Sequence, residues 1–335
     1  MKPPPSIRIV LLLLLAPACA VDELEESTTA QAGINMQGIN MQGINMQGIN
    51  MQGINMQGFA LGGATLSGQA IDNLHVEAGE LVGIRSGVAV RGTALAGTHL
   101  FASGTDAAGA PVQVEYRISA VQAELASYDP THTGSTYLYS LDQWVTDTST
   151  WSAACSADAD GRRVAIPVAS TFDAQGDRVY VPGMFTFGCT TGVIAKCYRW
   201  GYRPWVAGYG NLDDMHWTCT RLARADYCGD GTSHTHEGTR INVWDKLPAP
   251  GPIQKHGGLL PPLGMIFEAG WDTHGAVCLS RGRWLLDGGL LASLCPDRLV
   301  PLGLLGATVC DTVGEVLGQH PNALMFNESP LLNLF

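Results

Sequence analysis

The chain reads INMQGINMQGINMQGINMQGINMQG from Ile34 to Gly58, five identical copies of one five-residue unit. A fixed period of this kind is typical of proteins that stack one short structural unit many times. Within each copy the two apolar residues are two apart, as Ile34 and Met36 are, so an extended chain directs both to one face. The glycine can take the positive φ angle that a sharp corner needs. The unit therefore predicts a very short strand followed by a turn, and a glycine at every fifth position disfavours a helix.

Weaker copies of the unit continue to about Ala102 and keep an apolar central residue. These centres include Leu66, Ile71, Val76, Leu81, Val90, Leu95 and Leu100. In the residue types at Asn35, Met36 and Gly38, the pattern resembles the pentapeptide-repeat family. The resemblance implies a right-handed β-helix. We therefore predict a short β-helix for residues 33–102. The alternative is that a tandem duplication left a polar, glycine-rich spacer without regular structure.

The amino terminus has the features of an export signal. Lys2 and Arg8 are followed by the apolar run Ile9–Leu15 and by small residues up to Ala20, so residues 1–20 are predicted to be a signal peptide. Cys19 follows three small residues, as in bacterial lipoprotein signals, and this resemblance implies a lipid on Cys19 that anchors the protein to a membrane. Cleavage after Ala20 is the alternative. We expect a cell-envelope protein, either an outer-membrane lipoprotein or a secreted or periplasmic protein, with residues 21–32 as an acidic tether.

The cysteines support export. Removal or lipidation of Cys19 leaves eight cysteines, an even number that can form four disulfides in an oxidising compartment. The eight disulfide candidates are Cys155, Cys189, Cys197, Cys219, Cys228, Cys278, Cys295 and Cys310. The sequence leaves their pairing open. All eight lie after residue 102, so the disulfides are expected to brace only residues 103–335.

The charge of the chain argues against one class of partner. With 19 basic and 30 acidic residues, the net charge is −11. A surface that binds phosphates needs a basic excess, so nucleic acid is not an expected partner.

Residues 103–335 are expected to form an α+β domain that is rich in strands. Apolar residues alternate with polar ones in Val112–Ile118 and Tyr137–Leu141, and short apolar runs at Val164–Val168 and Val179–Phe187 predict further strands. Helices are predicted for Leu212–Ala225 and for Gly288–Leu294. The segment rich in proline and glycine, Leu247–Gly264, is predicted to be a long loop.

One stretch of this domain carries a second resemblance. It includes Phe185–Cys189, Ala195–Trp205, His216–Arg221 and the tetrapeptide Ala-Asp-Tyr-Cys at Ala225–Cys228. In these residues, and over roughly Val112–Cys310, the chain resembles the ADYC domain of exported proteins from myxobacteria and their relatives, in which pentapeptide-like leaders are typical. The resemblance implies no particular activity.

A polar cluster follows the tetrapeptide, within Asp226–Asp245. Its candidate metal ligands are Asp226, Asp230, His234, His236, Glu237 and Asp245. The twelve residues from Asp226 to Glu237 have the acidic and glycine positions of a calcium loop, although Cys228 replaces one oxygen ligand. Alternatively His234 and His236 hold zinc together with Asp226, Asp230 or His216. The third interpretation is a turn-rich loop without a metal, pinned by Cys228.

Aromatic residues crowd the segment before this cluster. Trp200, Tyr202, Trp205 and Trp217 are candidates for a flat recognition surface for a glycan or a peptide, and the alternative is that they fill the core.

Two functions follow from these observations. We favour a binding or structural module of the cell envelope that is not an enzyme and that contacts an envelope protein or glycan. The alternative is an exported metal-dependent hydrolase that uses the Asp226–Asp245 cluster.

Overall fold

The computed structural model describes residues 59–105, 111–124, 136–145, 148–158, 160–173, 175–235, 239–247, 264–284, 295 and 310–330. The described chain is rich in strands and contains three α-helices, in agreement with the predicted α+β class. Several predictions lie wholly or largely outside the described residues. They concern the signal peptide, Cys19, the tether, the perfect repeats Ile34–Gly58, His236, Glu237, the loop Leu247–Gly264 and the helix Gly288–Leu294.

All strand pairs among the described residues are antiparallel. The largest sheet has eight strands: β1 (Phe59–Leu66), β2 (Gln69–Ala70), β6 (Thr98–Thr105), β7 (Pro111–Ala123), β8 (Tyr137–Val145), β9 (Thr150–Ala153), β10 (Ala165–Val168) and β13 (Met184–Cys189). A three-stranded sheet contains β3 (Asp72–Glu77), β4 (Glu80–Arg85) and β5 (Val88–Arg91), and a short 3-10 helix, η2 (Gly92–Leu95), follows it. A small hairpin is formed by β11 (Thr171–Phe172) and β12 (Arg178–Val179). The four-stranded sheet has the order β14 (Asn242–Asp245), β17 (Met325–Pro330), β15 (Met265–Asp272) and β16 (Gly275–Leu279).

The eight-stranded sheet curls until β10 pairs with both β13 and β8. Its inner side is filled by alternate residues of each strand, such as Leu100, Tyr116 and Leu141, and Leu81 of the three-stranded sheet joins the same core. The predicted alternation is confirmed for Val114–Ile118 of β7, where every second side chain is buried. In β8, Tyr139 and Leu141 belong to this core, whereas Leu138 is buried in the neighbouring core that contains α1 and α2.

The β-helix prediction is wrong for Phe59–Ala102. Most apolar centres of the weaker repeats are buried as predicted, but the chain folds back and forth in antiparallel strands. The reason lies in the turns. Ser67 and Gly68 both have positive φ angles, as do Ser86 and Gly87. Two consecutive residues of this kind make the tight turn whose twist matches a β-hairpin, so each corner reverses the chain.

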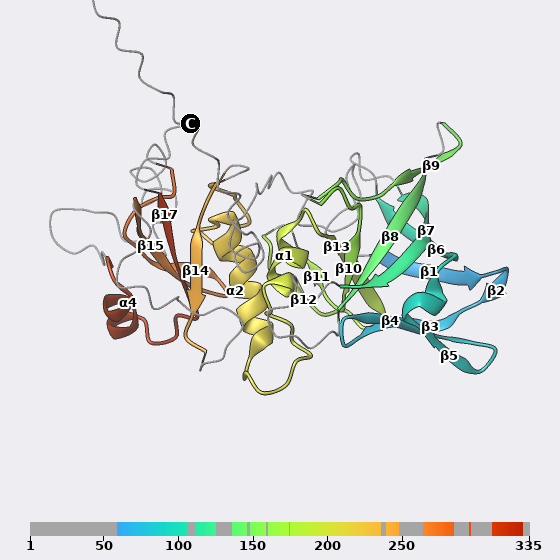
Figure 1. The fold of residues 1–335 in the computed structure, drawn as a ribbon, viewed down its shortest axis with the longest axis horizontal. Coiled ribbons are helices and arrows are strands. Elements are labelled where there is room, and N and C mark those ends of the chain that lie inside the picture. Colours follow the sequence, from blue (N-terminus) through green and yellow to red (C-terminus); the bar gives the residue numbers. More distant parts are fainter. Residues whose placement is uncertain are drawn as a thin grey trace, which may run out of the picture.

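Two of the three described helices lie between the two large β parts of the molecule (Figure 1). They are α1 (Val193–Arg199), which the sequence pattern did not predict, and α2 (Leu212–Arg224), which it predicted closely. Asn211 caps α2 by accepting a hydrogen bond from the Asp214 backbone N–H at 3.2 Å. The apolar side of α2, including Leu222, packs with Trp271 and Met325 of the four-stranded sheet. The opposite side of that sheet faces α4 (Val313–Gln319).

Eight cysteines form four disulfides, as predicted. The pairs are Cys155–Cys189, Cys197–Cys219, Cys228–Cys295 and Cys278–Cys310. Their number indicates an oxidising compartment outside the cytoplasm. Within the described ranges, no helix combines the length and the apolar character that a membrane span requires.

Candidate functional site

The Ala-Asp-Tyr-Cys segment follows α2 and is buried. Ala225 ends the helix in the left-handed conformation, with φ of 53°. Asp226 is fully buried, and its carboxylate accepts hydrogen bonds from Arg221 Nη1 at 2.5 Å and from the Gly231 backbone N–H at 3.1 Å. This carboxylate therefore balances the charge of a buried arginine.

Tyr227 belongs to a second buried network. Its hydroxyl donates to Glu268 Oε1 at 2.9 Å and accepts from the Arg283 backbone N–H at 2.8 Å. Arg283 makes two hydrogen bonds to the Glu268 carboxylate, at 3.0 and 3.1 Å, and two more to the last carbonyls of α2, those of Leu222 and Ala223. The network ties the end of α2 to β15, so the segment has a structural role.

The predicted metal ligands are not brought together in the part of the chain that the structure describes. Asp226 is occupied by Arg221, which disfavours the first ligand position of a calcium loop. Asp230 is exposed and accepts from the Thr232 backbone N–H at 2.8 Å, while Asp245 accepts from the Tyr202 hydroxyl at 2.8 Å. No group of three or more His, Cys, Asp or Glu side chains with metal-binding geometry occurs among the described residues. His234 is half-buried beside Tyr227. His236 and Glu237 lie outside the described residues, so a metal site that includes them stays a prediction.

His216, the other zinc candidate, has both ring nitrogens occupied. It is fully buried in α2, stacks on Tyr198 with the ring centroids 3.9 Å apart, and contacts the Ile194 carbonyl through Nε2 at 2.9 Å. Its Nδ1 accepts a hydrogen bond from Arg178, since a guanidinium can only donate. Burial and the charge of Arg178 lower the pKa of His216 well below its usual value. The ring is neutral and unavailable to zinc.

The lowered pKa of His216 predicts a loss of stability in acid. Below about pH 6.5 the unfolded chain takes up a proton at this histidine and the folded chain does not. The contribution of the neutral His216 ring to the free energy of unfolding is therefore fully present above that pH, and it falls by about 1.4 kcal/mol for each pH unit below it. Urea unfolding of the wild type and of His216→Gln, at pH 7.5 and 5.0, measures this: the variant is expected to have the shallower pH dependence. Equal dependence in both proteins would contradict the assignment.

The predicted aromatic surface is wrong for two of its four residues. Trp200 is 3% exposed and Tyr202 is fully buried, because the chain after α1 turns into the core. Trp205 is half-buried and packs edge-on against Tyr198, with the centroids 5.0 Å apart. Trp217 is also half-buried, 6.0 Å from the His274 ring. These residues do not form one flat surface.

A different aromatic surface lies on the outer side of the eight-stranded sheet, and we call it the outer aromatic face. It consists of His99, Phe101, Glu115, Arg117, Asp142, Trp144 and Trp151 on β6, β7, β8 and β9. These strands are neighbours at the end of the molecule away from α4 (Figure 1). Trp144 and Trp151 pair directly across β8 and β9 and meet edge to face at 5.4 Å. Phe101 is 39% exposed, which is unusual for a ring on a sheet.

Charged and polar side chains lie among these rings in two pairs. Arg117 donates to Asp142 Oδ2 at 2.7 Å, and its guanidinium lies 4.6 Å from the centre of the Trp151 ring. His99 Nδ1 contacts Glu115 Oε1 at 2.7 Å. The side chains of both pairs are between 21% and 36% exposed, so ring surface and hydrogen-bonding groups reach solvent together.

The outer aromatic face was not predicted from the sequence. Its signal was present: in strands where apolar residues alternate, Glu115, Arg117, Asp142 and Trp144 are out of phase with the buried residues. An aromatic side chain in the polar phase of a strand indicates an exposed ring.

A model of the ADYC domain family matches residues 92–285, more than half of the chain. The chain belongs to the ADYC domain family. The match begins before the expected Val112 and ends before the expected Cys310, and it includes the whole outer aromatic face together with the Ala225–Cys228 segment. No curated protein and no solved structure matches the chain.

The two parts of the ADYC domain differ in chemical capacity. The Asp226 and Tyr227 networks use their polar atoms to hold buried elements together, so they offer few groups to a ligand. The outer aromatic face offers rings, a guanidinium and carboxylates to solvent. Such a combination can stack on an apolar surface and exchange hydrogen bonds at its edges.

Proposed function

We propose that this ADYC-domain protein is a cell-envelope protein that binds a glycan on the outer aromatic face. The observation that supports the proposal is the mixture of the Trp144 and Trp151 rings with the Arg117–Asp142 pair on one exposed sheet. A sugar ring has apolar C–H faces and a rim of hydroxyl groups. The tryptophan rings can stack on the C–H faces, and the charged pair can form hydrogen bonds with the hydroxyl groups.

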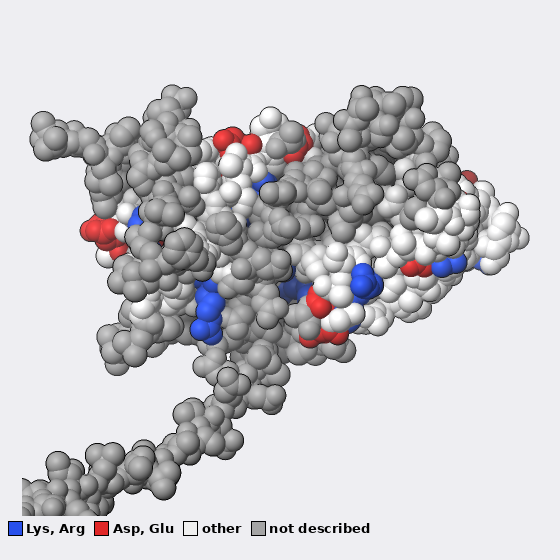
Figure 2. All heavy atoms as spheres, turned by 90° about the horizontal axis from the view of Figure 1, so that it is seen from above, with Lys and Arg blue, Asp and Glu red and all other residues white. Residues whose placement is uncertain are grey.

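The charges of the face favour an uncharged polymer. Arg117 is balanced by Asp142, which leaves Glu115, in contact with the His99 ring, as the remaining carboxylate of the face, so a highly charged partner meets little net charge here. On the surface seen in Figure 2, the described basic and acidic side chains likewise lie in small separate groups. The polysaccharides of an envelope are partners that this surface can recognise through rings and hydroxyl contacts.

Affinity electrophoresis in native gels tests this function. Dextran and hydroxyethyl cellulose serve as uncharged probes, and at least one of them is expected to slow the wild-type protein. Trp151→Ala removes the ring that contacts Trp144, His99 and Arg117, and we expect it to weaken the association by about tenfold or more.

A matched control separates ring loss from general damage. Tyr180 is 60% exposed and lies next to β12, outside the outer aromatic face, so Tyr180→Ala is expected to migrate like the wild type. Phe101→Ala provides a second variant on the face should Trp151→Ala melt early. If neither polysaccharide slows the wild type, or if both face variants bind as it does, the proposed function is wrong.

The location is part of the same proposal. The four disulfides support an envelope protein, and a lipid on Cys19 would place it at a membrane, with the described domain carried by the preceding chain. Mass spectrometry of the natively processed protein checks this: an acylated terminal Cys19 is expected, and an unmodified terminus after Ala20 would favour the secreted or periplasmic alternative. Nothing in the described part of Asp226–Asp245 favours the metal-dependent hydrolase.

A further inference from the structure

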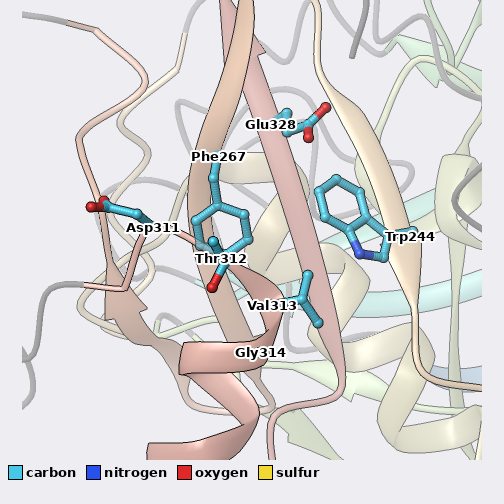
Figure 3. Close-up of a pocket in the computed structure, with 7 residues that line it drawn as sticks. All are labelled: Trp244, Phe267, Asp311, Thr312, Val313, Gly314 and Glu328. Carbon is cyan, nitrogen blue, oxygen red and sulfur yellow. The ribbon is translucent and has the colours of Figure 1, made fainter. Parts of the chain in front are cut away.

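A cleft of about 460 Å³ lies on the four-stranded sheet, at the end of the molecule opposite the outer aromatic face. Trp244 of β14, Glu328 of β17 and Phe267 of β15 line its floor, and the segment 311–314 at the start of α4 lines its other side. β17 lies between the other two strands, and Figure 3 shows Glu328 extending from it with the two rings on either side. The volume is in the range of small-molecule sites.

The lining combines aromatic rings with acidic groups. Glu328 is only 6% exposed, and Asn242 Nδ2 donates to its Oε2 at 3.3 Å. Asp311 lies at the rim, and Figure 3 shows its carboxylate directed away from the two rings. No Lys or Arg side chain is among the described residues that line the cleft. A buried carboxylate that shares a cleft with Trp and Phe rings is complementary to an organic cation, through charge attraction and through cation–π contact.

The wall that carries Asp311 is held in place before any ligand arrives. The Cys278–Cys310 disulfide fastens the preceding residue to β16, and the Ser280 hydroxyl donates to Asp311 Oδ1 at 2.6 Å. The Glu315 carboxylate accepts from the Asp311 backbone N–H at 2.7 Å, and its negative charge offsets the positive end of α4. A preformed site loses little ordering entropy when it binds.

We propose that this cleft binds an organic ammonium group attached to an apolar body, with Glu328 as the charge partner and Trp244 and Phe267 as its aromatic walls. The site is separate from the outer aromatic face, and its binding does not depend on the proposed glycan. Segment 311–314 and Glu328 also lie beyond residue 285, outside the part of the chain that the family model matches.

Titration calorimetry of the mature protein tests the site with four probes of similar shape. Benzylammonium and benzyltrimethylammonium carry the cation as a primary or a quaternary amine, benzyl alcohol is uncharged, and benzenesulfonate is an anion. At least one ammonium probe is expected to bind about tenfold or more tightly than benzyl alcohol. Comparison of the two ammonium probes shows which amine the cleft prefers.

Glu328→Gln preserves the shape of the side chain and the Asn242 contact while it removes the charge. We expect this variant to bind the preferred ammonium probe about tenfold more weakly than the wild type. Glu77→Gln is the matched control, because the Glu77 side chain is 58% exposed on β3; it is expected to change nothing. Asp311→Asn serves as the second variant should Glu328→Gln fold poorly, and about a threefold loss is expected at this more exposed position. Equal binding of cations and alcohol, or variants with unchanged affinity, would overturn the proposal.

Discussion

Replacement of Arg283 by methionine is expected to lower the free energy of unfolding by about 3–5 kcal/mol. The side chains of Arg283 and Glu268 are both fully buried. The guanidinium also donates hydrogen bonds to the Leu222 and Ala223 carbonyls. The variant leaves the Glu268 charge buried with only the Tyr227 hydroxyl as a described donor. An uncompensated buried charge is far more costly than a lost surface contact.

Urea unfolding with fluorescence detection measures this effect, and Arg91→Met is its control. The Arg91 side chain is half-exposed and lies 3.1 Å from Glu77, so its replacement is expected to cost less than about 1 kcal/mol. Removing both buried charges, in Arg283→Met with Glu268→Leu, is expected to recover part of the loss. Similar costs for Arg283→Met and Arg91→Met would show that the buried pair does not hold α2 to β15.

The second large effect is expected from the disulfide Cys228–Cys295, which begins in the Ala225–Cys228 segment. It closes a loop with a sequence separation of 67 residues. In the chain-entropy model, such a cross-link stabilises the fold by about 4 kcal/mol, because it restricts the unfolded chain. The variant with both cysteines changed to alanine is expected to lose a comparable free energy of unfolding.

The disulfide Cys197–Cys219, between α1 and α2, provides the comparison. Its separation is 22 residues, so the same model predicts a loss smaller by about 1 kcal/mol when both of its cysteines become alanine. Denaturant unfolding of the two double variants shows which loses more free energy of unfolding. If the loss is larger for Cys197–Cys219, the effect comes from packing around α1 and α2 and not from the unfolded chain.

Residue pattern alone was sufficient where the decisive interactions are local. The alternation in Val112–Ile118 and Tyr137–Leu141 identified β7 and β8, because a strand that covers one core buries every second side chain. The spacing of apolar residues and the early aspartates identified α2 to within one residue of its end. Cysteine parity identified four disulfides, since parity does not depend on which partners meet.

The repeated quintets show where local pattern fails. They marked buried residues such as Leu66 and Leu81 correctly, but the direction in which the chain leaves each turn is set by two backbone angles that the apolar period does not contain. α1 was missed because its seven residues are too few for a clear helical period.

The sequence by itself thus determined the α+β class, the main strands, α2 and the cross-linked character of the domain, because these follow from neighbours along the chain. Tertiary structure alone decided that Trp200 is buried while Trp151 reaches solvent, that Arg283 meets Glu268 and the end of α2, and that Glu328 stands between Trp244 and Phe267. Each of these depends on contacts between residues far apart in sequence. Exposure and charge pairing are properties of the packed chain, and no local pattern records them.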